Sequence, residues 1–168
     1  MARTARPAKI PVIMIAVIQR VSEARVVVAG EVVGQIGVGM MVLAAVQKGD
    51  TREDLEWVAR KLVGLRIFRN GDKYFDADVR QVGGSILLVS NFTVAANTRE
   101  GRRPSFIAAA ETETGRAMFD NLIAAVRALG VPVETGRFGA EMVVSLVNDG
   151  PVTVLVDSTA KTSSINLP

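Results

Sequence analysis

The stretch Ile86-Leu87-Leu88-Val89-Ser90-Asn91-Phe92-Thr93 decides how the centre of this chain folds. Its four apolar residues in a row are typical of a strand that is buried on both faces. Hydroxyl and amide side chains follow where that strand ends. Because binding and catalytic groups are often presented on the segments that leave such strands, we predict a site here. A second stretch of interest, Asn148-Asp149-Gly150-Pro151-Val152-Thr153, lies between two further apolar runs.

Composition limits the chemistry that this site can use. The chain has 168 residues, 49% of them hydrophobic, which suits a single domain with one core. It contains neither histidine nor cysteine, which excludes disulfides, thiolate nucleophiles and the usual zinc ligands. No run of spaced carboxylates suggests a site for a hard cation. We therefore predict no metal and no cofactor, so that catalysis must rest on backbone groups, hydroxyls, amides or the substrate itself.

The distribution of charge says more than the net charge of +3. Four of the 20 basic residues lie in the first 13 positions or at Lys161, so residues 14–158 carry 16 basic and 17 acidic side chains. A polyanionic partner would have to meet a local basic patch. The densest patch holds Arg99, Arg102 and Arg103, directly after the first stretch. Arg102 and Arg103 either contact phosphates or pair with acids on the surface.

The N-terminus resembles a signal peptide only in part. Basic residues precede the apolar run 10–18, but no small-residue cleavage site follows and Pro11 interrupts the run. We predict a disordered extension over 1–13, a folded domain over 14–158 and a C-terminal tail over 159–168. The absence of cysteine is compatible with a reducing compartment, and we predict a cytoplasmic protein. No apolar stretch approaches the roughly 20 residues of a membrane span.

The hydrophobic pattern predicts an α/β domain with two helices. The first helix should begin after Thr51 as N-cap, with Asp54 in the first turn, and end near Gly64. The second should run from about Thr112 to Leu129. Strands are expected over 15–21, 24–28, 31–36, 40–46, 66–68, 86–89, 142–147 and 152–156.

Two local features allow two interpretations each. Gly150-Pro151 should form an exposed kink, since proline removes a ladder hydrogen bond. The kink is either an ordinary turn between antiparallel strands, which turn chemistry favours, or a device that presents carbonyls to a ligand. Ser90 and Thr93 carry hydroxyls at a strand end, and such hydroxyls more often bond to the backbone than take part in catalysis.

A series of motifs along residues 14–158 adds a resemblance. It includes Gly34-Gln35-Ile36-Gly37, Leu65-Arg66-Ile67-Phe68, Gly101-Arg102-Arg103-Pro104-Ser105-Phe106, Phe138-Gly139-Ala140 and the stretch from Leu146 to Thr153. In this order and spacing the chain resembles the bacterial D-aminoacyl-tRNA deacylases, also called D-tyrosyl-tRNA deacylases. The resemblance implies a single α/β domain of that type, with β-barrel or sheet layers and two helices, that acts as a homodimer without a membrane.

The resemblance also implies the site. The family's Ser-Gln-Phe-Thr segment falls on residues 90–93, where Asn91 is one methylene shorter than the family's glutamine. Gly150 and Pro151 correspond to a cis peptide that enters the active site of the partner subunit. Arg102 and Arg103 become candidates for contacts with tRNA.

The implied reaction is hydrolysis of the ester of D-aminoacyl-tRNA and of glycine mischarged on tRNA, with L-aminoacyl esters rejected sterically by the Gly-Pro pair. Backbone amides near Phe92 and Thr93 would stabilise the oxyanion. Thr93 is either the nucleophile or a positioning group; without a histidine to activate it, we favour positioning, with a ribose hydroxyl orienting the water. The alternatives are a catalytically impaired tRNA-binding protein of the same fold, if Asn91 disables the pocket, and a ligand-binding barrel unrelated to tRNA.

Overall fold

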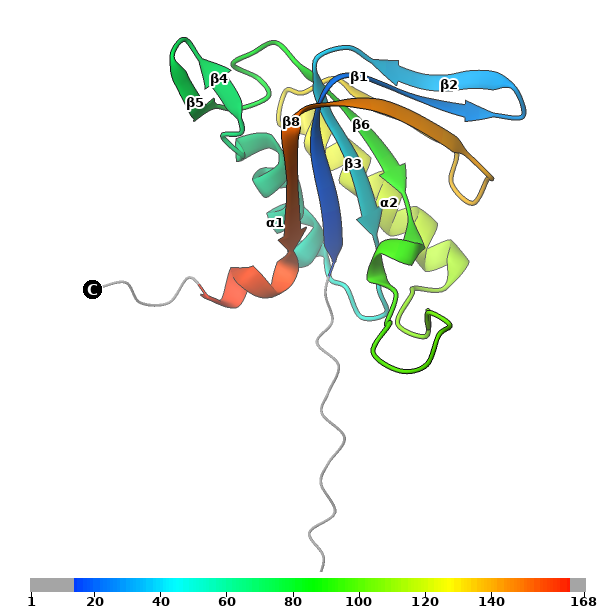
Figure 1. The fold of residues 1–168 in the computed structure, drawn as a ribbon. Coiled ribbons are helices and arrows are strands. Elements are labelled where there is room, and N and C mark those ends of the chain that lie inside the picture. The colour runs from blue at the N-terminus through cyan, green and yellow to red at the C-terminus, as the bar shows by residue number, and fades with distance from the viewer. Residues whose placement is uncertain (1–13, 164–168) are drawn as a thin grey trace, which may run out of the picture.

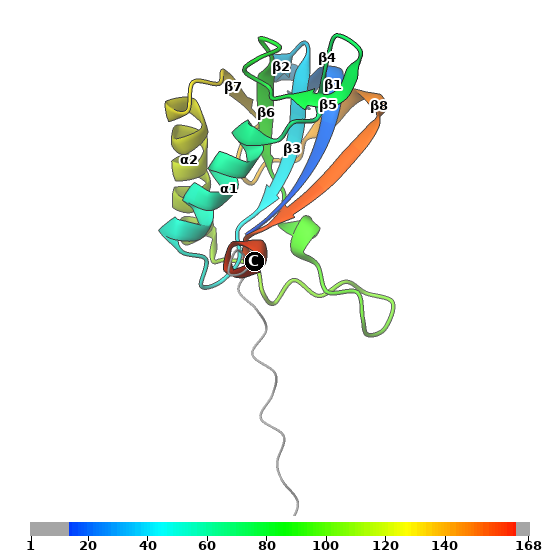
Figure 2. The ribbon, with the colours of Figure 1, turned by 90° about the vertical axis from the view of Figure 1, so that its left-hand side faces the viewer.

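A computed structural model describes residues 14–163 of the chain. They form one mixed α/β domain in which two helices lie side by side against a curled sheet (Figures 1 and 2). The predicted fold class is confirmed. The extension predicted over 1–13 lies outside the described residues. The predicted C-terminal tail is described as far as residue 163 and begins within a 3-10 helix, η2 (Ser158–Ser163).

The long strand β1 organises the main sheet. It pairs antiparallel with β8 along most of its length, with β3 through its first half and with β2 through its second half. Beyond β3 the sheet continues with β6 and β7, each parallel to its neighbour. The strands are β1 (Ile15–Val28), β2 (Glu31–Ile36), β3 (Gly39–Ala45), β6 (Ser85–Ser90), β7 (Val133–Thr135) and β8 (Val143–Asp157).

The sheet nearly closes on itself because β2 approaches β7. A Cβ atom added at Gly34 would lie 2.2 Å from the carbonyl oxygen of Thr135, so only glycine permits this approach. A small inner core fills the curl and includes Val26, Met41 and Leu87. The barrel-like layer of the predicted fold results from this closure.

The two helices cover the outer face of the sheet (Figure 2). They are α1 (Arg52–Gly64) and α2 (Thr112–Ala128). Thr51 is the N-cap of α1, and Thr51 and Asp54 form the reciprocal pair of hydrogen bonds of a capping box, as predicted. The apolar faces of both helices pack on β1, β3 and β6 through Leu62 and Leu122, which are fully buried. No helix within residues 14–163 is long and apolar enough to cross a membrane.

Several predicted strand boundaries are wrong. The strands expected over 15–21 and 24–28 are one strand, and β8 likewise continues through Gly150-Pro151, which rules out the ordinary turn. The strand predicted at 66–68 lies later, as β4 (Phe68–Asn70), and forms a hairpin with β5 (Lys73–Ala77). Neither β5 nor β7 was predicted, because both strands are short and the partner of β7, strand β6, is remote in the sequence.

Candidate active site

A cavity of about 520 Å³ opens at the end of β6, where the polar residues follow the buried strand. Ser90 ends β6, and the amide of Asn91 donates to the carbonyl oxygen of Ala44 at 2.9 Å, which ties this end to β3. The chain then turns into the 3-10 helix η1 (Phe92–Ala95). The cavity is lined by Leu43, Val89, Ser90, Asn91, Phe92, Phe106, Ala109, Ala110, Thr112, Phe138, Gly139, Ala140, Met142 and Val144.

No side chain in this lining carries a charge. The lining side chains that can form strong hydrogen bonds are those of Ser90, Asn91 and Thr112. An uncharged cavity with aromatic walls and a few hydroxyl and amide groups suits a neutral, partly aromatic ligand such as a nucleoside. General acid or base catalysis by a carboxylate or an amine of the lining is therefore excluded.

Asn91 holds the groups of Thr93. Its side-chain oxygen accepts a hydrogen bond from the backbone amide of Thr93 at 3.2 Å and another from the Thr93 hydroxyl. Asn91 is thus the N-cap of η1. The Thr93 hydroxyl donates to an amide oxygen, which is not a base, so this bond does not activate it as a nucleophile. Thr93 itself is exposed and lies beside the cavity.

Aromatic side chains build the walls of the cavity. Phe92 and Phe106 pack edge to face, with ring centroids 5.1 Å apart. Phe106 is held near β3 because Ala110 donates to the carbonyl oxygen of Val46 at 3.1 Å. Opposite them, Phe138 carries the guanidinium of Arg116 over its ring at 4.7 Å. Residues 138–140 line this cavity, a role that the sequence did not predict. They reach the cavity wall through contacts with residues that are remote in the sequence.

The second predicted segment forms a bulge in β8 opposite Arg20. Gln19 pairs with Thr153 and Val21 pairs with Asn148, so the four residues 149–152 of β8 face the single residue Arg20 of β1. The side-chain oxygen of Asn148 accepts from the Val152 amide at 2.8 Å, and its amide nitrogen donates to Gln19 at 2.9 Å. Gly150 and Pro151 are exposed at the tip. The bond between them is cis, as the resemblance predicted.

Within one protomer this bulge is remote from the cavity. Ser90 pairs with Ala44, which pairs with Ala16, whereas the bulge lies opposite Arg20 and on the other side of β1. Four residues along the strands and three strand spacings across the sheet correspond to about 13 Å and about 14 Å. The structure therefore does not bring Gly150 and Pro151 to residues 90–93 of the same chain.

The predicted basic residues lie on the loop between η1 and α2. Arg102 and Arg103 are exposed on the loop that follows η1, which is closed by two hydrogen bonds of 2.9 Å between the backbones of Asn97 and Ser105. Neither arginine forms a salt bridge with another residue in the described part of the chain. Residues 14–163 also contain no cluster of three or more acidic side chains that could hold a metal ion.

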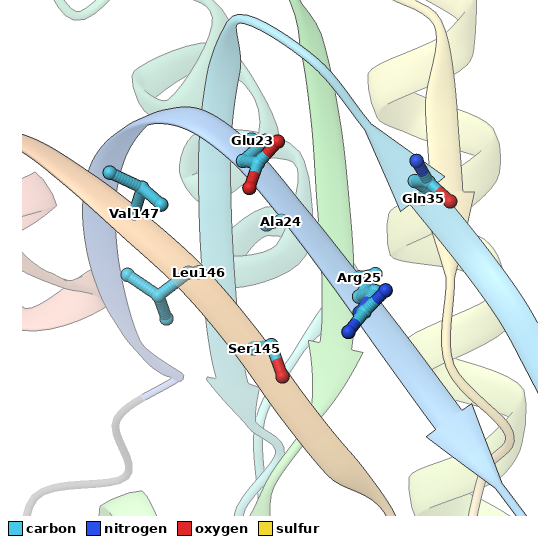
Figure 3. Close-up of a pocket in the computed structure, with 7 residues that line it drawn as sticks. All are labelled: Glu23, Ala24, Arg25, Gln35, Ser145, Leu146 and Val147. Carbon is cyan, nitrogen blue, oxygen red and sulfur yellow. The ribbon is translucent and has the colours of Figure 1, made fainter. Parts of the chain in front are cut away.

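A second, smaller hollow of about 190 Å³ lies between β1 and β8 (Figure 3). Its charged side chains, Glu23 and Arg25, come from β1, while Ser145 and Val147 lie opposite on β8. It contains none of the predicted site residues. The cavity at the end of β6 is therefore the stronger candidate for the active site.

The sequence of this chain is similar to those of known proteins. A family model described as D-Tyr-tRNA(Tyr) deacylase matches residues 17–157. The chain is 52% identical over 145 residues to a D-aminoacyl-tRNA deacylase of Desulfitobacterium hafniense (strain DSM 10664 / DCB-2), covering 86% of this chain and 97% of that relative. It is also 52% identical over 151 residues to a D-aminoacyl-tRNA deacylase of Geobacter sulfurreducens (strain ATCC 51573 / DSM 12127 / PCA), covering 90% and 99%.

Solved structures agree with the fold. A protein titled c-Myc DNA Unwinding Element Binding Protein superimposes with a TM-score of 0.82 at 36% identity, over 85% of this chain and 97% of that one. A structure of a probable eukaryotic D-amino acid tRNA deacylase gives a TM-score of 0.75 at 18% identity, over 86% and 99%. At that identity the second match supports the fold alone.

Proposed function

The chain belongs to the D-aminoacyl-tRNA deacylase family and is a hydrolase of D-aminoacyl-tRNA, and we propose that it works as a cytoplasmic homodimer with residues 14–158 as the deacylase domain. In the dimer, Gly150 and Pro151 of one protomer enter the cavity at residues 90–93 of the other. The homodimer is supported by the separation of Gly150 and Pro151 from residues 90–93 within one chain. Hydrolysis of an ester is supported by the uncharged cavity, whose hydrogen-bonding side chains are hydroxyls and an amide.

Such a cavity suits hydrolysis of an activated ester. The aminoacyl ester needs a positioned water and a donor for the developing oxyanion more than it needs a strong nucleophile. The backbone amide of Phe92 is our candidate for that donor, because the Thr93 amide already donates to Asn91. The neighbouring ribose hydroxyl of the terminal adenosine orients the water. Thr93, which is held by Asn91, positions the substrate and does not attack.

Selection for the D-enantiomer follows from the bulge. Its exposed carbonyl groups at Gly150 and Pro151 accept hydrogen bonds from the ammonium group of the substrate, while their backbone leaves no room for an L side chain. Arg20 and Asn148 hold the bulge from inside, so its carbonyls keep a fixed position. Steric rejection predicts that D-amino acids of many sizes are accepted, and that glycine esterified to tRNA is also hydrolysed.

The contact must come from a partner subunit, because the bulge and the cavity of one chain lie far apart. Exposed apolar side chains on β8, namely Val143, Val147 and Leu155, offer a surface for that partner. Arg102 and Arg103 contact phosphates of the incoming tRNA at the mouth of the cavity. These basic side chains have no acidic partner among residues 14–163.

The test is a matched pair of substrates, one tRNA charged with D-tyrosine and with L-tyrosine. We expect rapid release of the D-amino acid and no release of the L-amino acid above the uncatalysed rate, from a protein that sediments as a dimer. Equal hydrolysis of both esters would overturn the steric mechanism. Binding of tRNA without hydrolysis of the D-ester would support the impaired tRNA-binding protein instead.

A further inference from the structure

The end of α1 lies beside the β4–β5 hairpin, away from η1 (Figures 1 and 2). Basic and aromatic side chains form a surface there. Residues 57–76 contain five basic and two acidic side chains, a net charge of +3, whereas the rest of residues 14–158 has a net charge of −4. We call this surface the hairpin face. Its side chains are those of Trp57, Arg60, Lys61, Arg66, Arg69 and Tyr74, whereas Lys73 and Phe75 alternate to the other side of the hairpin.

The first part of the hairpin face is a hollow of about 490 Å³ lined by Trp57, Leu65 and the side chains of Arg60, Lys61 and Arg66. The ammonium group of Lys61 lies 5.4 Å from the centre of the Trp57 ring. Lys61 and Arg60 are exposed. The hollow thus combines an aromatic wall with three cations, which suits a polyanion that also carries flat rings.

The second part is the hairpin itself. Tyr74 and Phe75 are 59% and 64% exposed and, as neighbours in β5, point to opposite sides of the hairpin, so that Tyr74 belongs to the hairpin face. The guanidinium carbon of Arg69 lies 3.9 Å from the centre of the Tyr74 ring. This stacking fixes the direction of the guanidinium N–H groups.

The acids on this surface leave most of its cations available. Arg66 and Asn70 both donate to the carboxylate of Asp76, at 3.0 and 2.8 Å. Three other cations of the hairpin face form no salt bridge within the described residues, namely Arg60, Lys61 and Arg69. The hairpin face is therefore electrostatically unbalanced.

The hairpin face also adjoins the bulge of β8. Arg20 donates at once to the carbonyl oxygen of Asp149, at 2.8 Å, and to that of Ile67, at 2.7 Å. If the bulge enters the cavity of the partner subunit, as the proposed function requires, the hairpin face borders the mouth of that cavity. An RNA whose 3′ end occupies the cavity would then pass over it.

We propose that the hairpin face binds the sugar-phosphate backbone of the tRNA whose ester is hydrolysed in the partner's cavity. This inference rests on the proposed function for the identity of the RNA. Phosphate contacts supply most of the sequence-independent affinity for nucleic acids, and cationic side chains without acidic partners are the groups that make such contacts. The hairpin face would bind different tRNAs alike, because phosphates carry no sequence information.

The test measures the affinity for uncharged tRNA across a range of salt concentrations. The variant carries Arg60→Gln and Arg69→Gln, and the matched control is Arg52→Gln, which removes an exposed arginine at the other end of α1. Loss of two phosphate contacts should lower the slope of log K against log salt by about 1.4 to 1.8. We expect the variant, but not the control, to bind tRNA about tenfold more weakly at low salt. A second pair, Lys61→Gln with Arg69→Gln, should behave in the same way.

A short substrate separates binding from chemistry. The variant should hydrolyse a D-aminoacyl ester of adenosine at the wild-type rate, while its KM for full-length D-aminoacyl-tRNA rises. An unchanged salt slope in both pairs, or an equal loss on the short substrate, would overturn the proposal. The proposal would also be overturned if the variants bound tRNA like wild type but lost binding to vesicles of anionic phospholipid. Failure of wild-type protein to hydrolyse D-esters while it binds tRNA through this face would overturn the proposed function alone.

Discussion

Arg20 on β1 and Asp149 on β8 are joined by a hydrogen bond of 2.8 Å from the guanidinium Nε to the carbonyl oxygen. The Asp149 carboxylate lies 3.7 Å from the same nitrogen, and Nη1 of Arg20 donates to the carbonyl oxygen of Ile67 at 2.7 Å. Arg20 is 8% exposed, so these bonds form in a nearly dry environment. One buried arginine therefore fixes the bulge that carries Gly150 and Pro151 relative to the base of the β4–β5 hairpin.

Arg20→Lys tests this fixation. Lysine keeps the charge but offers a single ammonium group, which cannot reproduce the planar fork that reaches two carbonyls. We expect a loss of about 1–3 kcal/mol in the free energy of unfolding and at least a tenfold loss of kcat/KM on D-tyrosyl-tRNA. The measurements are urea unfolding and single-turnover deacylation. Arg25→Lys, exposed on the same strand, is the matched control and should change neither; equal activity of both variants would contradict the role of Arg20.

Thr93→Val tests whether the hydroxyl is a nucleophile. Valine keeps the shape of threonine, and the wild-type hydroxyl donates to the amide oxygen of Asn91, which cannot accept its proton in a reaction. We expect the variant to keep at least about a tenth of the wild-type kcat, whereas loss of a covalent nucleophile would remove nearly all activity. Background activity in a variant that remains folded would favour the nucleophile.

Metal chelation should leave the reaction unchanged. The chain lacks histidine and cysteine, and the cavity lining carries no carboxylate. We expect equal rates on a D-aminoacyl ester of adenosine with and without EDTA, since this substrate needs no magnesium to fold. A loss of activity that a divalent cation restores would point to a metal site formed by acidic side chains elsewhere.

Asp50 should make the stability of the protein depend on pH. Burial raises the pKa of Asp50 to about 6, and the neighbouring Asp54 adds to the rise, while the Gln47 amide and Lys161 oppose it. Among the described residues one oxygen of Asp50 is buried without a hydrogen-bond partner. Because the folded state holds this proton more tightly than the unfolded state, the contribution of Asp50 to stability falls as pH rises from about 4 to about 6.

Asp50→Asn removes this titration. Relative to wild type, the variant should gain stability between pH 4 and pH 6 and show a constant difference above pH 7. The measurement is the free energy of unfolding in urea at several pH values, with Asp72→Asn on the exposed hairpin as control. A difference between variant and wild type that does not change with pH would contradict the assignment.

Short sequence patterns predicted those helices and strands that are determined by neighbouring residues. Thr51 and Asp54 mark the start of α1, and the apolar run before Ser90 marks the buried strand. The continuity of β8 could not be predicted, because Asn148 replaces the lost ladder bonds with side-chain bonds to residues 19 and 152. The walls of the cavity also escaped prediction, since Phe138 and Met142 reach it only after the sheet has curled. Residues 90–93 could be named as candidates from the sequence because a strand end and a family motif coincide there.

The hydrogen bond from the Thr93 amide to the Asn91 side chain could not be predicted from the sequence either. Asn91→Asp tests the role of the Asn91 side chain in catalysis. Aspartate has nearly the same shape as asparagine, so its carboxylate can accept the same two hydrogen bonds from Thr93. It adds a negative charge to a cavity lining that otherwise has none. That charge opposes the oxyanion that forms when water attacks the ester.

We therefore expect Asn91→Asp to lower kcat on a D-aminoacyl ester of adenosine at least tenfold at pH 7.5, with the loss shrinking as the pH falls toward the ordinary pKa of a carboxyl group, about 4. Wild type should show no such recovery, because its amide does not titrate. Asn91→Gln, which restores the family residue without a charge, is the control and should stay within about threefold of wild type. If Asn91→Asp hydrolyses the ester at the wild-type rate throughout this pH range, the oxyanion does not form beside residue 91 and the donor must be sought elsewhere in the cavity.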